Sequence, residues 1–171
     1  MTEAAIRSYR PADHSAARAL WVEFVEQHRE LYGTPQTAGD PGAAFEEYLT
    51  RLDLSGLWVA EDPADGVVGL IGLIMRGRVG EVEPIVVSAA HRGSGIGRAL
   101  LDHVAEQARK RSLARLTITP ESRNVTALRS LHAAGYDVLS AVELSLHLRG
   151  GSGGGRSVGE DIELMGLRFR S

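Results

Sequence analysis

The chain has 171 residues, 43% apolar and 24% charged, which is the size and composition of one globular domain. A formal net charge of −3 does not favour a nucleic-acid partner, and the absence of cysteine excludes disulfides, cysteine metal sites and a thiol nucleophile. We find no signal-like N-terminus, no membrane-length apolar run and no metal-binding histidine spacing, so we expect a cytoplasmic protein without a membrane or metal partner.

The first part of the chain predicts a short strand and two helices. Ile6–Arg10 has the pattern of a strand, and apolar residues at helical spacing from Ala17 to Leu31 predict a long helix. His28 and Tyr32 end that helix, either as partly buried boundary residues or as the lining of an acceptor site. After a loop rich in proline and glycine, Phe45–Leu52 predicts a second, shorter helix.

Three strands in succession are expected next. They are Leu57–Glu61, the long apolar run Val67–Met75, and Val82–Val87, separated by turn residues. The third strand leads into a loop rich in small residues.

Alternating helices and strands follow the loop. We expect a helix over Arg98–Lys110 and a strand over Leu116–Thr119. Asn124 is placed to cap the next helix, and Gly135 to close it as the glycine after its C-terminus.

The C-terminal part predicts two strands around a flexible connection. Apolar residues alternate strictly with polar ones over Val142–Leu148, which predicts a half-buried strand. Arg149–Gly159 is rich in glycine and serine, and Ile162–Phe169 resumes a strand pattern. The two strands would pair as a hairpin, or the last one would be exchanged with a partner subunit. Together the elements indicate a mixed α/β fold around a central sheet.

The loop before the predicted helix suits a phosphate group. Gly93, Gly95 and Gly97 permit close approach of a ligand to the backbone, the helix N-terminus offers free N–H groups, and Arg92 and Arg98 add charge. The spacing is neither that of a P-loop nor that of a dinucleotide-binding fingerprint. A nucleotide site therefore rests on the glycines alone.

The loop resembles the acyl-CoA-binding loop of the GNAT superfamily of N-acetyltransferases. That family has Q/R-x-x-G-x-G/A between a strand and a helix, here Arg92-Gly93-Ser94-Gly95-Ile96-Gly97. A second family element, N-x-x-A followed by Gly-aromatic, is matched by Asn124, Ala127, Gly135 and Tyr136.

The resemblance implies one N-acetyltransferase domain over residues 1–171, with a central, mostly antiparallel twisted sheet that is splayed at the cofactor site and flanked by about four helices. It implies acetyl-CoA as cofactor, with CoA as product. The main chain of Ile85, Val86 and Val87 would pair with the amide arm of the cofactor, with a polarising N–H near Val86. The other implied cofactor-binding residues are Arg92, Gly93, Ser94, Gly95, Ile96, Gly97, Arg98, Asn124 and Ala127.

Two acids precede this stretch, Glu81 and Glu83. Residues two apart on a strand share a face, so both would favour a cationic amine. Glu83 lies nearer the implied thioester site, where we expect its carboxylate to lie among apolar neighbours, and we favour it as the base that takes the proton from the amine. The alternative is that both acids face solvent at the end of a strand.

The sequence departs from the family at the proton donor for the leaving thiolate. Many members carry a tyrosine seven residues after the asparagine of the second element, and Leu131 stands there. Ser130, His132 or Tyr136 would substitute, or the thiolate would leave unaided.

Two functions follow from these residues. The first is acetyl-CoA-dependent acetylation of a small-molecule or peptide amine by direct attack in a ternary complex, because no cysteine is present to carry the acyl group. The second is a non-catalytic acyl-CoA-binding module, which the leucine at position 131 motivates. The oligomeric state stays open, with a homodimer as the commonest arrangement.

Overall fold

The computed structural model describes residues 4–33, 39–145 and 161–169. The chain divides into two compact units: Met1–Gln27 with Ala38–Thr119, and His28–Thr37 with Pro120–Ser171. None of the helices in the described residues combines the length and apolarity that crossing a membrane requires.

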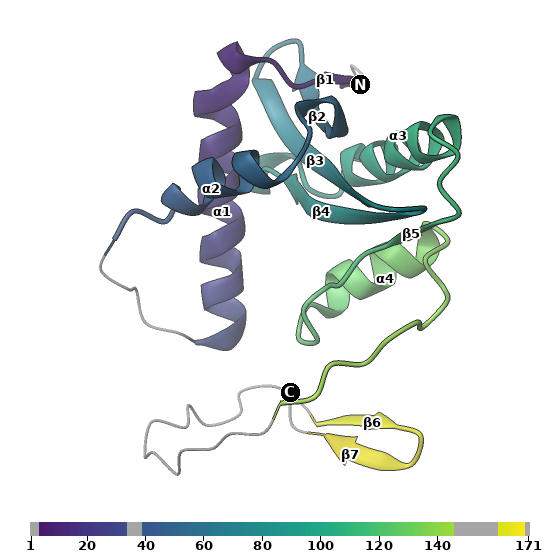
Figure 1. The fold of residues 1–171 in the computed structure, drawn as a ribbon. Helices are drawn as coiled ribbons and strands as arrows, with labels where there is room; N and C mark the ends of the chain where they lie inside the picture. Colours follow the sequence, from purple (N-terminus) through teal and green to yellow (C-terminus); the bar gives the residue numbers. More distant parts are fainter. Residues whose placement is uncertain (1–3, 34–38, 146–160, 170–171) are drawn as a thin grey trace. The chain divides into compact units, whose positions relative to one another are not determined.

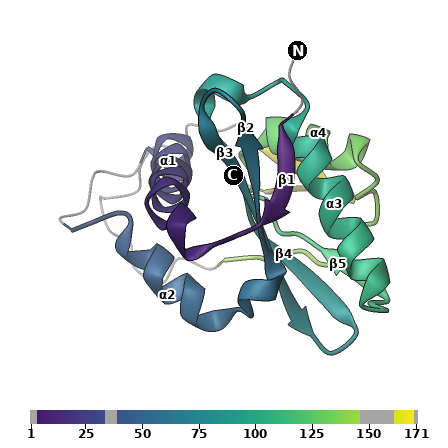
Figure 2. The ribbon, with the colours of Figure 1, turned by 90° about the horizontal axis from the view of Figure 1, so that it is seen from above.

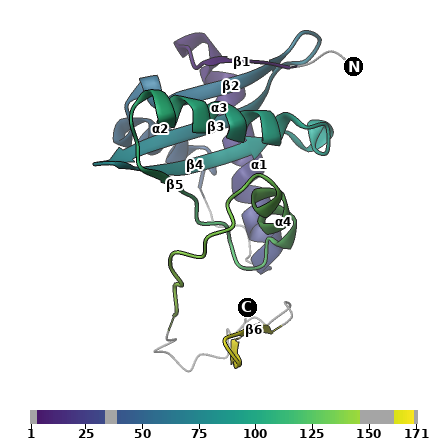
Figure 3. The same cartoon turned by 90° about the vertical axis from the view of Figure 1, so that its right-hand side faces the viewer.

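The first unit is built on a five-stranded sheet whose strands lie in chain order, as Figure 3 shows. The first three pairs are antiparallel, and the last pair, β4 with β5, is parallel. The strands are β1 (Ala5–Ser8), β2 (Leu57–Asp62), β3 (Gly66–Arg76), β4 (Val79–Val87) and β5 (Arg115–Thr117).

Helices cover both faces of this sheet (Figures 1 and 2). The part of α1 (His14–Tyr32) that belongs to the first unit and α2 (Ala43–Arg51) lie on one face, and α3 (Ile96–Lys110) lies on the other. Three short 3-10 turns join these elements: η1 (Pro11–Asp13), η2 (Leu54–Gly56) and η3 (Ala89–His91).

The core under α1 and α2 is largely aromatic. Trp21 packs on Phe45 and Tyr48 with ring centroids 5.6 and 5.0 Å away. These rings cover apolar side chains of the central strands, and each is at most 7% exposed. On the opposite face α3 buries Leu100, Leu101, Val104 and Ala108, which recur at helical spacing.

The predicted mixed α/β fold is confirmed, and so is the mostly antiparallel sheet. Element ends differ by a few residues. The third strand of the meander begins at Val79 rather than Val82, α3 begins at Ile96 rather than Arg98, and β5 ends at Thr117. Local propensity fixes such ends only loosely.

In the second unit, α4 (Val125–Ala133) is followed by residues 136–145, which are in neither helix nor strand, and the described part of the chain ends in a hairpin of β6 (Ile162–Leu164) with β7 (Leu167–Phe169). The predicted strand over Val142–Leu148 is wrong for its described part, because residues 141–145 are not in a strand and pair with no other described strand. Val142 and Leu144 are 52% and 68% exposed. The predicted flexible connection, Arg149–Gly159, lies outside the described residues.

Candidate functional site

The main-chain N–H and carbonyl groups of alternate residues of β4 are directed at β3, with which β4 is paired. The N–H of Ser88 donates to the carbonyl of Val68 at 2.9 Å. Successive residues of a strand direct their main-chain groups to opposite sides, so Val86 also faces β3, whereas Ile85 and Val87 face away from it. The carbonyl of Val87 accordingly accepts a hydrogen bond from outside the sheet.

β4 and β5 separate after a short paired stretch. Within the described residues they pair only at Val79–Glu81, opposite Arg115–Thr117. Beyond Glu81 the outward main-chain groups of β4, those of Ile85 and Val87 included, lie along an edge to which no described strand is paired. This separation is the splay that the family resemblance implied.

A β-bulge interrupts β4 just before this edge. The register of β3 with β4 shifts between Ile71 and Leu73, so that Glu83 and Pro84 both lie opposite Gly72. The strand therefore turns locally at the residue that carries the favoured base.

The bulge is held from α2. The hydroxyl of Tyr48, whose residue is only 1% exposed, donates to the main-chain carbonyl of Glu83. Gly72 leaves the room for this contact, because a Cβ there would overlap both the Tyr48 hydroxyl and the Glu83 carbonyl oxygen. This contact was not predicted from the sequence, although a glycine inside an apolar strand and a proline inside its neighbour are both signals of a bulge.

Each of the two predicted acids is paired with an arginine. Glu81 accepts from Arg76 at 2.7 Å, and Glu83 lies 3.5 Å from Arg51. Their side chains are 32% and 42% exposed. The expectation that Glu83 lies among apolar neighbours is therefore wrong, because α2 places a guanidinium beside it.

The glycine loop has the backbone that its sequence predicts. Gly93 and Gly95 have φ of 76° and 92°, which glycine adopts without strain. A Cβ at either position would meet no atom of the described chain within 4 Å. Gly95 is the N-cap of α3, so the N–H groups of Ile96 and Gly97 lack an acceptor within the helix. Open space beside the N-terminus of a helix fits an anionic group such as a pyrophosphate.

Two arginines flank these donors. The Nε of Arg92 donates to the Val87 carbonyl at 3.1 Å, and the Nε of Arg98 donates to Asp102 at 2.9 Å. Ser94 takes part in the loop through its own hydroxyl, which donates to the carbonyl of His91 at 2.5 Å.

A polar network lies at the base of the loop. His91 Nδ1 is 2.8 Å from the Ser88 hydroxyl, and His91 Nε2 is 3.0 Å from Asp65 in the turn between β2 and β3. Glu23 of α1 accepts from the N–H of Ala89 at 2.9 Å. The loop is thereby tied to two other elements of the first unit.

The second family element lies in the second unit. Asn124 caps α4 by accepting from the N–H of Ala127 at 3.0 Å, as predicted, and Gly135 follows the helix with φ of 94°. Leu131 is buried, whereas His132 is exposed. The Leu131 side chain is thus buried and has no ionisable proton to donate.

The end of α1 belongs to this unit as well. Glu121 accepts from the hydroxyl of Tyr32 at 2.5 Å and lies 3.0 Å from His28 Nε2, and Arg123 stacks over the Tyr32 ring at 4.8 Å. Burial, together with the hydrogen bond to Glu121, raises the pKa of Tyr32. The two boundary residues of the predicted helix therefore hold the segment that leads to the cap of α4.

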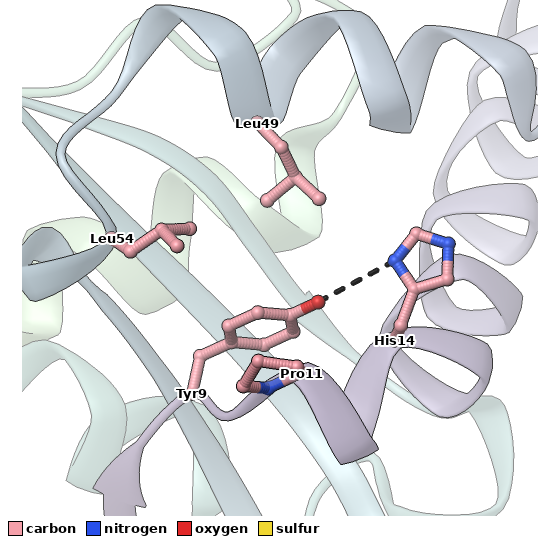
Figure 4. A pocket seen from close by; sticks show the side chains of 5 residues that line it. All are labelled: Tyr9, Pro11, His14, Leu49 and Leu54. Atoms are coloured by element: carbon pink, nitrogen blue, oxygen red, sulfur yellow. Dashed lines mark hydrogen bonds between the residues drawn. The ribbon is translucent and has the colours of Figure 1, made fainter.

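One pocket of about 290 Å³ lies elsewhere in the first unit (Figure 4). It is mostly apolar, and Figure 4 shows the Tyr9 hydroxyl directed at His14, 3.4 Å from Nδ1. No residue of β4 or of the glycine loop lines it. Its lining residues are Tyr9, Pro11, His14, Leu49 and Leu54.

Residues 17–136 match the acetyltransferase (GNAT) family, a span that includes β4, the glycine loop and α4. The chain belongs to the GNAT acetyltransferase family. This GNAT chain is 40% identical over 138 residues to glucosamine 6-phosphate N-acetyltransferase 1 of Oryza sativa subsp. japonica, covering 70% of the chain and 84% of the relative.

Solved structures agree with this membership. Ribosomal-protein-alanine N-acetyltransferase from Brucella melitensis superposes with a TM-score of 0.62 at 27% identity, covering 77% of this chain and 83% of that one. A transcriptional regulator from Bacillus halodurans C-125 has the same fold at 23% identity, with a TM-score of 0.63 and coverage of 84% and 99%. The GNAT chain is thus an N-acetyltransferase, and its reaction is acetyl transfer to an amine.

Proposed function

We propose that this protein uses acetyl-CoA to acetylate the primary amine of a small molecule or peptide, by direct attack in a ternary complex. The observation that carries the proposal is the open edge of β4, which runs directly into the glycine loop and the N-terminus of α3. We also propose that both units belong to one N-acetyltransferase domain, residues 1–171, since the family match runs through both.

The residues present fit acetyl-CoA. Ile85 and Val87 offer main-chain groups with which no described strand is paired, and these suit an amide arm laid along β4; Val86, between them, is buried. The pyrophosphate would lie against the N–H groups from Gly93 to Arg98, with Arg92 and Arg98 supplying positive charge. Asn124 and Ala127, at the N-terminus of α4, are also proposed as cofactor-binding residues.

Acetyl-CoA, when bound, supplies an activated acyl group. A main-chain N–H of Ile85 or Val87 would stabilise negative charge on a carbonyl oxygen at this edge, because such donors are already fixed in direction. The assignment to these two residues refines the expected donor near Val86, whose own N–H faces β3.

Glu83 is the proposed base, with Glu81 beside it. A cationic amine that reaches Glu83 would compete with Arg51 for the carboxylate, and the carboxylate would then take the proton directly or through water. With no cysteine in the chain, no acyl-cysteine forms, and the amine attacks directly.

Protonation of the leaving thiolate is assigned to His132 as a candidate. It is exposed on α4, next to the buried Leu131 that replaces the family's tyrosine. Ser130 and Tyr136 remain alternatives, as does departure of the thiolate without a donor.

The acceptor class is an amine. The rice relative acts on glucosamine 6-phosphate and the Brucella structure is that of a ribosomal-protein-alanine acetyltransferase, so these two kinds of amine head the panel to be tested. Both arginine–glutamate pairs near β4 offer groups of either charge, which suits an acceptor that carries an anion besides its amine.

Calorimetric titration with acetyl-CoA tests the cofactor assignment, with NAD and ATP as competing ligands. For acetyl-CoA we expect a Kd of about 1–100 μM in the wild type and a Kd about tenfold higher in Arg92→Ala. Arg109→Ala, at the far end of α3, should leave the Kd unchanged. Tighter binding of NAD or ATP would replace acetyl-CoA by a nucleotide ligand.

Thiol release with the amine panel tests the chemistry. Glu83→Gln should lower kcat by about 100-fold or more, whereas Glu106→Gln on the exposed side of α3 should not. An unchanged rate in Glu83→Gln would move the base to Glu81. Cofactor binding without turnover of any amine would favour the non-catalytic acyl-CoA-binding module.

A further inference from the structure

Helix α2 reaches Glu83 at two points. Tyr48 donates to its main-chain carbonyl, and Arg51, one turn later, lies 3.5 Å from its carboxylate. Arg51 also stacks over the Tyr48 ring at 5.9 Å. One residue of β4 is thus held both by its backbone and by its side chain.

The contact from Tyr48 comes from a buried, well-packed side chain, whereas the contact from Arg51 comes from an exposed one. The Tyr48 ring packs against Trp21 at 5.0 Å and is nearly without solvent contact. Burial raises the pKa of the Tyr48 phenol, so the hydroxyl keeps its proton and stays a donor. Arg51 is 51% exposed and therefore free to yield to another cation.

Gly72 makes the arrangement possible. Any side chain there would occupy the space where the Tyr48 hydroxyl meets the Glu83 carbonyl. The bulge lies at this point, so the residue whose direction it sets is Glu83.

We propose that Tyr48 is a positioning residue for the reaction: through the Glu83 carbonyl it fixes the bulge of β4, and so aims the Glu83 carboxylate at the acceptor amine. This rests on the proposed function, since it assumes that Glu83 is the base. Tyr48 itself touches neither substrate, and it acts only through Glu83.

The test compares Tyr48→Phe with Tyr9→Phe, which removes a hydroxyl next to His14 on another part of the fold. Tyr48→Phe keeps the ring and its packing, so the protein should stay folded. We expect kcat to fall by about 10- to 100-fold with the KM for acetyl-CoA within about twofold, because small displacements of a reacting group cost that much. Tyr9→Phe should leave both constants unchanged.

A double variant separates positioning from general loosening. In a Glu83→Gln background, Tyr48→Phe should lower kcat by no more than about twofold, because residues that act as a unit are not additive. An equal loss in both backgrounds would overturn the proposal, as would an unchanged kcat in Tyr48→Phe.

Amide hydrogen exchange gives a readout that needs no turnover. In Tyr48→Phe the peptide over 82–87 should exchange at least about fivefold faster, while peptides of α3 keep their protection. If the wild-type protein acetylates no amine, the proposed function fails, and this result still decides whether Tyr48 holds the bulge. Unchanged exchange over 82–87 would mean that it does not.

Discussion

Arg92 is bound to the strand that precedes its own loop: its Nε donates to the main-chain carbonyl of Val87, 3.1 Å away. One of its guanidinium nitrogens is thereby used for placement, and the others remain to meet an anion. The planar guanidinium holds its donors in fixed and widely spaced directions, which suits both purposes at once better than the compact ammonium of a lysine.

We expect Arg92→Lys to keep the charge and lose the placement. Acetyl-CoA affinity should fall by about threefold, less than in Arg92→Ala, with a similar dependence on salt. Calorimetry at two salt concentrations checks this. Wild-type affinity in the lysine variant would mean that charge alone matters at this position.

Gly95 and Gly97 predict different outcomes on substitution by alanine. Gly95 has φ of 92°, so Gly95→Ala should cost about 1–2 kcal/mol of stability. Gly97 lies in α3, where a Cβ would meet Val87 at an ordinary 3.8 Å. Gly97→Ala should therefore unfold like the wild type.

Cofactor binding separates the same two variants again. If the backbone at Gly97 is approached closely by a ligand, Gly97→Ala should weaken acetyl-CoA binding by about tenfold despite its normal stability. Urea unfolding and titration of each variant give both numbers. Normal affinity in Gly97→Ala would show that no ligand comes close at this residue.

His91 links the loop to the turn between β2 and β3. Both of its ring nitrogens have partners, Ser88 and Asp65, and its side chain is 21% exposed. We expect His91→Ala to reduce acetyl-CoA affinity by about three- to tenfold. Without the His91 contacts the loop would be ordered only on binding, and that ordering would cost binding free energy. Asp65→Asn, which keeps an acceptor for His91, should have a smaller effect in the same titration.

Asp13 predicts how stability changes in acid. Its side chain is 8% exposed and bonded to Arg7 at 2.7 Å, and these bonds lower the pKa of its carboxyl. The stabilisation is therefore present above about pH 4, the ordinary pKa, and is lost as pH falls below it.

Asp13→Asn should accordingly cost about 2 kcal/mol at pH 7, where a charged hydrogen bond is removed, and clearly less at pH 3. Urea unfolding of both proteins at the two pH values measures the difference. Asp102→Asn, in an exposed pair on α3, serves as the control, and an equally large loss there would contradict the role of burial.

Most of what the sequence predicted correctly depends on neighbours along the chain. The cap at Asn124, the closing glycine at Gly135 and the strand, loop and helix around Gly93 each need only a few adjacent residues. Such features follow from local backbone chemistry, which a sequence displays directly.

The contacts that position Glu83 could not be predicted in that way. Tyr48 lies 35 residues away in the chain, and Gly72 belongs to a third element. Only the fold brings them together. The strand expected at Val142 failed for a related reason, since alternation supplies a face to bury but no neighbouring strand to pair with.

The pairing of Glu81 with Arg76 and of Glu83 with Arg51 has a consequence for the kinetics of encounter. Positive and negative charges balance at this end of β4, so its surface exerts little long-range attraction on a cationic amine. The association rate of such an acceptor would therefore depend only weakly on ionic strength. Its binding would be governed by short-range contacts in the site rather than by electrostatic steering.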